Sequence, residues 1–259
     1  MIKFFRNIRK KLLNEGKTTQ YFKYAIGEIV LVVIGILIAL QINNWNEHRK
    51  ELQKELVIVK ELHKELQQNL RVTTKHLHHI EKINQEVLFL LNVSNDSLKL
   101  ITDKELNQHI FKSSKITSFI PINQKLKRIL GIENFGFRHS KTLLNELQDY
   151  NNSIEDLSSM NLSAVDIFRN KMVPFLSENM SIKNLMHEIY PNKISVSHNY
   201  VDLRLMIKSM AFENIYADFF ASYTAYILTL EHNIQLTNSL IKHIEEAYPS
   251  VILNKETSL

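Results

Sequence analysis

The residues of this chain best suited to metal chemistry are three histidines close together, His76, His78 and His79, followed by Glu81. Residues three apart share a helix face, so His76 and His79 could present two imidazoles to zinc or copper. Such a site needs at least one more ligand from another helix, and no sequence spacing supplies it. We therefore expect solvated histidines, and predict no metal and no other cofactor.

Other arrangements typical of catalysis are incomplete. His187-Glu188 lacks the second histidine of H-E-x-x-H, because Pro191 stands in its place. His243 and Glu246 are expected to be an ordinary surface pair on one helix face. The chain has no G-x-S-x-G turn, no phosphate-binding glycine loop, no dinucleotide fingerprint and no cysteine. The sequence predicts no catalytic residue and no enzyme.

The longest apolar stretch, Tyr24 to Ile42, is the element around which the chain is organised. As a helix it would span about 28 Å, close to the roughly 30 Å hydrocarbon core of a bilayer. A cleaved signal peptide is the first alternative, but the run is too long and lacks an A-x-A site. A buried soluble helix is the second, but residues 29–40 have no polar face. We predict a single transmembrane helix.

Five positions in or beside this helix invite specific interpretations. Tyr24 and Trp45 flank the apolar run as interfacial anchors. Gly35 and Ala39 form a small-xxx-small pair that would permit close packing of two helices. Glu28 is the one charged residue in the span, so it could carry ions or protons, or pair with a cation of another subunit. Alternatively, Glu28 reaches the cytoplasmic interface beside Lys23.

The net charge of +5 is concentrated before the anchor. Residues 1–23 carry seven lysines and arginines against one glutamate, whereas the remainder has 25 basic and 26 acidic residues. This distribution places the N-terminus in the cytoplasm and the bulk of the chain outside, which in a Gram-negative cell is the periplasm. It disfavours nucleic acid as a partner. A basic amphipathic helix on the membrane surface, or one facing a cytoplasmic protein, is expected to present Lys3, Arg6, Arg9, Lys10 and Lys11.

After Trp45, apolar residues recur every three, four or seven positions as far as Leu91, a stripe typical of a coiled-coil or bundle helix. The exposed face alternates acids and bases, as in Glu61, Lys64 and Glu65, and should consist of solvated pairs. A polar break should follow at 92–97. Later helices are expected at 98–116, with Thr102 or Asp103 as a cap, and at 122–130, 140–157, 163–180 and 201–247.

Only five glycines and four prolines occur in 259 residues, which favours an all-α fold. We predict an elongated antiparallel bundle outside the membrane, with the aromatic residues of the last helix packed on the first long helix. The expected segments are a cytoplasmic arm (1–23), the membrane helix (24–42), the periplasmic bundle (43–250) and a C-terminal tail (251–259).

The opening FFRNIRKKLLNEGKTTQYFKYAIGEIVLVVIGILIALQINNWNE resembles a family of uncharacterised single-pass membrane proteins from flavobacteria and their relatives. A looser resemblance covers the central segment, from Phe119-Ile120-Pro121 through Leu126, Leu130-Gly131 and Leu143 to Tyr150. The resemblance implies the topology described above. It implies no activity, because the family is a domain of unknown function.

Two functions remain open. The first is a tethered module that binds a protein partner, associates with itself or senses a ligand outside the inner membrane. The second is a subunit of a membrane assembly that uses Glu28 for ion or proton coupling. In either case the partners are the lipid bilayer and another protein or a second copy of the chain.

Overall fold

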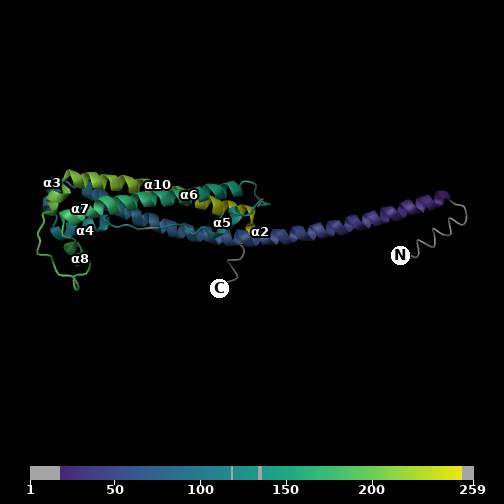
Figure 1. The fold of residues 1–259 in the computed structure, drawn as a ribbon, viewed down its shortest axis with the longest axis horizontal. Coiled ribbons are helices and arrows are strands. Elements are labelled where there is room, and N and C mark those ends of the chain that lie inside the picture. Colours follow the sequence, from purple (N-terminus) through teal and green to yellow (C-terminus); the bar gives the residue numbers. More distant parts are fainter. Residues whose placement is uncertain (1–17, 118, 134–135, 253–259) are drawn as a thin grey trace. The chain divides into compact units, whose positions relative to one another are not determined.

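The computed structural model describes residues 18–117, 119–133 and 136–252. Within these ranges every regular element is helical, so the predicted all-α class is confirmed (Figure 1). The chain divides into two compact units, residues 1–57 and residues 58–259. The finer division into four segments stays a prediction.

Unit 1 is described from residue 18 onward and consists of the first part of helix α2, Thr18–Asn92. From Ile29 to Ile42 its large apolar side chains are all exposed, and none of them packs into a core in the described part of the unit. The helical pattern without glycine or proline after Gly35 explains why α2 continues to Asn92, one residue beyond the predicted limit.

Unit 2 contains the remainder of α2 and all later elements (Figure 1). These are α3 (Asn95–Leu100), α4 (Asp103–Ser113), α5 (Gln124–Leu130), α6 (Leu143–Ile167), the π-helical turn η1 (Phe168–Met172), α7 (Val173–Asn179), α8 (Ile182–Ile189), α9 (Leu203–Ile207), α10 (Met210–Ala247) and the 3₁₀ turn η2 (Pro249–Val251). Helices α6 and α10 lie side by side along much of their length.

Capping residues set several of these boundaries. Thr102 caps α4 in a complete capping box with Glu105, which confirms one of the two predicted caps and places Asp103 in the first turn. Ser94 caps α3, so the predicted polar break at 92–97 shrinks to two residues. Ser209 caps α10, and the predicted helix 201–247 is wrong at its start because α9 and α10 are separate.

A proline explains the irregular middle of unit 2. Pro174 lies in the first turn of α7 and cannot donate a backbone hydrogen bond to the preceding turn. The wider π turn η1 absorbs this mismatch, so the chain passes from α6 into α7 without a loop. The two helices expected at 140–157 and 163–180 are therefore one longer α6 followed by η1 and α7. Helix α8 was not predicted.

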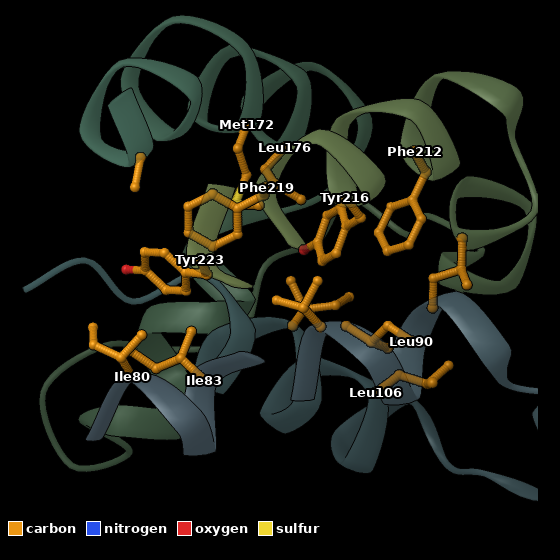
Figure 2. Close-up of a cluster of buried hydrophobic side chains, with 14 of the residues drawn as sticks. Ile80, Ile83, Leu90, Leu106, Met172, Leu176, Phe212, Tyr216, Phe219 and Tyr223 are labelled. Carbon is orange, nitrogen blue, oxygen red and sulfur yellow. The ribbon is translucent and has the colours of Figure 1, made fainter. Parts of the chain in front are cut away.

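The core of unit 2 is built on aromatic residues of α10. Phe212, Tyr216, Phe219 and Tyr223 follow one another along the helix and are buried (Figure 2). They face apolar residues of α2 and α4 on one side and of η1 and α7 on the other, including Ile80, Ile83, Leu90, Leu106, Met172 and Leu176. The predicted packing of the aromatic stripe against the first long helix is confirmed.

Candidate functional site

The apolar part of α2 is the first candidate site. An 18-residue window of this helix has a mean hydropathy of 2.6, and none of the window is buried within the protein. Ile29 and Ile42 are 63% and 61% exposed, and the large apolar residues between them point in every direction around the helix. By length and composition this is the one segment of the described chain that could cross a membrane. A signal sequence near the N-terminus would share these features.

The predicted anchor residues take the following positions. Tyr24 lies within α2. Gly35 and Ala39 lie on the open helix surface, and no atom would meet a Cβ added at Gly35. Trp45 is 63% exposed, and the Arg49 guanidinium lies over its ring, 5.4 Å from the centroid.

Glu28 is partly buried on the same helix. The predicted membrane-surface residues Lys3, Arg6, Arg9, Lys10 and Lys11 lie outside the described residues.

The three clustered histidines have separate environments. His78 is exposed and its Nδ1 lies 3.0 Å from Glu81 Oε2. His79 is also exposed. The prediction of solvated histidines is wrong for His76, whose Nε2 lies 3.0 Å from the Tyr226 hydroxyl and whose ring packs on Phe119. Burial, and secondarily the charge of His79, lower the pKa of His76 from 6.5 to about 4.

The described residues offer no site for a metal ion formed by three or more converging His, Asp or Glu side chains. Histidines instead join different helices through carboxylates. The predicted pair of His243 with Glu246 is wrong, because His243 reaches α6 and Lys242 is the partner of Glu246. The interhelical pairs are His63–Glu245 at 2.8 Å, His109–Glu86 at 2.6 Å and His243–Glu146 at 2.8 Å.

Two polar residues of α2 hold the chain that leads into α5. Asn69 accepts a hydrogen bond from the Ile122 amide at 2.9 Å, and its Nδ2 donates to the Ile122 carbonyl and to the Tyr150 hydroxyl at 3.1 Å. Glu65 accepts from the amides of Lys125 and Leu126, which are among the unpaired donors in the first turn of α5. The prediction that Glu65 belongs to a solvated charge pattern is therefore wrong, since it is 9% exposed.

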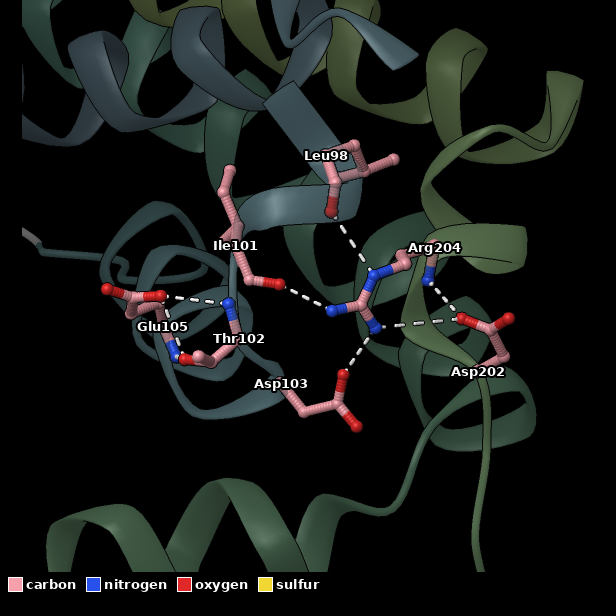
Figure 3. Close-up of polar contacts among 7 residues, drawn as sticks. All are labelled: Leu98, Ile101, Thr102, Asp103, Glu105, Asp202 and Arg204. Carbon is pink, nitrogen blue, oxygen red and sulfur yellow. Dashed lines mark hydrogen bonds and ion pairs between the residues drawn. The ribbon is translucent and has the colours of Figure 1, made fainter. Parts of the chain in front are cut away.

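Arg204 forms a comparable tie at α9 (Figure 3). Its Nε donates to the Leu98 carbonyl at 3.2 Å, and its terminal nitrogens contact the Ile101 carbonyl and the Asp103 carboxylate. Both carbonyls belong to the end of α3 and the turn before α4, where backbone acceptors lack helical partners. One guanidinium thus joins α9 to the consecutive helices α3 and α4.

With this geometry established, comparison with known proteins gives one match. Residues 28–124 match a family of unknown function (DUF6090). The matched segment runs from Glu28 in the apolar part of α2 to the first residue of α5, and it includes both Glu65 and Asn69. It supports the predicted resemblance to an uncharacterised domain. No curated protein and no solved structure matches the chain significantly.

Proposed function

We propose that this is a single-pass membrane protein whose helical bundle outside the membrane acts as a tethered protein-interaction or sensing module. In this proposal the segment 24–42 crosses the inner membrane, the N-terminus is cytoplasmic, and residues 43–250 form an elongated antiparallel bundle in the periplasm. The basic residues before the span support this orientation through the positive-inside rule.

The observation that carries the proposal is that no residue in the apolar window of α2 is buried. Between Ile29 and Ile42 stand eleven isoleucine, leucine and valine residues. At about 0.3–0.6 kcal/mol each in the bilayer centre, they favour insertion by roughly 3–7 kcal/mol. In water these side chains would remain exposed, because unit 1 has no other described element that could cover them.

A binding role for unit 2 is supported by the contacts of its buried polar residues, which are structural. The buried or partly buried Asn69, Glu65, Arg204 and His63 all hold helices or loops together. Such ties give a stiff scaffold and leave the exposed surface for contact with a partner. We therefore assign the unit a binding role and no catalytic one.

The test is crosslinking of the full-length protein in native membranes, followed by identification of the crosslinked species. Recovery of a distinct protein crosslinked to exposed positions of unit 2, such as Ser177, would support the tethered module. Crosslinks confined to copies of the apolar helix would contradict it.

The second candidate is a membrane assembly coupled to ions through Glu28, supported by the position of this carboxylate within three residues of Ala25 at the start of the span. Glu28→Gln removes the charge and keeps the shape of the side chain. A pure tether should retain its crosslinked partner in this variant, whereas an ion-coupled assembly should lose its transport or coupling activity.

A further inference from the structure

A groove of about 440 Å³ lies in unit 2 where α2 passes the end of α4. Its volume falls in the range of small-molecule sites, about 300–1,000 Å³. The groove is lined by His79, Lys82, Ile83, Gln85, Glu86, Lys112 and Lys115.

The lining is strongly cationic. Its three lysines face a single carboxylate, Glu86, and this carboxylate is already engaged by His109 at 2.6 Å and by Lys112 at 3.4 Å. Lys82 and Lys115 form no ion pair with any residue in the described part of the chain. The groove therefore has an excess of about two positive charges that no ion pair among the described residues neutralises, a condition that favours an anionic occupant.

The lysines stand on a fixed framework. The Lys115 carbonyl accepts a hydrogen bond from the Tyr223 hydroxyl at 3.0 Å, which ties the segment after α4 to α10. Ile83 is 3% exposed and anchors the α2 wall in the core. The Lys115 ammonium lies 4.8 Å from the centroid of the Phe111 ring, which restrains this side chain. A site whose walls are already in place loses less conformational entropy when a ligand binds.

We propose that this groove binds a phosphate-bearing anion. Ammonium groups act on phosphate as converging point charges, and the described lining contains no arginine fork of the kind that suits a planar carboxylate. The excess of two charges matches a doubly charged phosphate group, and the volume admits a phosphorylated small molecule or a lipid headgroup. This inference names a ligand class for the tethered module and in that sense rests on the proposed function.

The test is titration of the purified full-length protein, in a neutral detergent, with inorganic pyrophosphate by calorimetry at low ionic strength. The wild-type protein should bind, and added salt should weaken binding. Lys82→Gln and Lys115→Gln should each weaken binding about five- to tenfold, as expected for loss of one charge-assisted contact. Circular dichroism melting curves of both variants should match that of the wild type, because both side chains lie outside the core.

Lys242→Gln is the matched control. Lys242 is an exposed lysine on α10 that pairs with Glu246, the residue after Glu245, and Glu245 contacts His63. His63 and Lys82 are 19 positions apart on α2, about 28 Å along the helix. Binding that is unaffected by Lys242→Gln and weakened by the groove variants supports the site.

Absence of binding to the wild type would overturn the proposal, as would equal loss in all three variants, which would indicate non-specific attraction. Citrate that competes as strongly as pyrophosphate would overturn the assignment to phosphate. Competition by glucose 1-phosphate or by micelles containing phosphatidic acid would support it and would distinguish a soluble ligand from a headgroup. A negative result in this titration would not contradict the proposed tethered module, since membrane association and partner crosslinking are measured separately.

Discussion

Replacement of Asn69 by alanine should destabilise unit 2 by about 3 kcal/mol. The side chain is 2% exposed and makes three hydrogen bonds, two with the backbone of Ile122 and one with the hydroxyl of Tyr150. Each bond contributes about 0.5–1.5 kcal/mol, and a buried partner left without a bond costs about 1–3 kcal/mol. Ile122 is 43% exposed, so water can partly replace its lost bonds, whereas Tyr150 is 1% exposed. We therefore take a loss of about 1 kcal/mol in the free energy of unfolding for each of the three hydrogen bonds.

The assay is thermal unfolding of the full-length protein in detergent, followed by far-ultraviolet circular dichroism. For a unit of about 200 residues, 3 kcal/mol corresponds to a decrease in Tm of roughly 6–12 °C. Asn151→Ala is the matched control, because its Nδ2 donates only to the exposed Glu155 on the same helix, at 3.1 Å. It should change the Tm by less than about 2 °C.

A second substitution, Asn69→Asp, keeps the volume of the side chain but removes its amide donor. The carboxylate can still accept from the Ile122 amide but cannot donate to the Ile122 carbonyl. At pH 7 it should therefore be at least as destabilising as alanine, and it should recover part of the loss at low pH when it gains a proton. An Asn69→Ala protein that melts within 2 °C of the wild type would refute the reasoning.

Three further predictions concern unit 2. The pKa of His76 is about 4 in the folded chain and 6.5 when unfolded, so stability should fall by about 1–2 kcal/mol, after allowance for solvent screening, as the pH drops from 6.5 towards 4. His76→Gln should remove this pH dependence of stability, measured from melting curves between pH 6.5 and 4. An unchanged pH dependence would show that other groups cause it. Phe219→Ala deletes a fully buried ring and should cost about 3–5 kcal/mol in urea unfolding, with a loss below 1 kcal/mol contradicting the core description. Arg204→Gln should speed amide hydrogen exchange in residues 95–107, which it ties to α9, and unchanged exchange there would show that the tie is unimportant.

The long elements of this fold could be predicted because their signal is local. The apolar period from Leu52 to Leu91 marks one helix face, and the aromatic period in α10 marks another. The break before α10 was missed because Ser209 looks like any serine until its hydroxyl is found to accept the Phe212 amide.

The polar ties could not be predicted because their partners are distant in sequence. Asn69 and Ile122 are 53 positions apart, and no local pattern connects them. One signal was present: positions 62, 66, 69, 73, 77 and 80 follow a helical period, and all six side chains are buried. That series places Asn69 and Thr73 on the core face, where a polar residue needs a partner. The neighbouring apolar residue Leu70 lies outside this series and is only partly buried.

The measurement that tests the central claim most directly is cysteine labelling in intact cells, because the chain has no cysteine of its own. Single variants Leu37→Cys, in the middle of the apolar segment, and Ser177→Cys, on the exposed surface of α7, are treated with a membrane-impermeant maleimide after the outer membrane is made permeable. The account predicts rapid labelling at position 177 and labelling at position 37 only after addition of SDS. Equal labelling of both positions in intact cells would contradict a membrane-embedded helix, and labelling of position 177 only after lysis would contradict the proposed orientation.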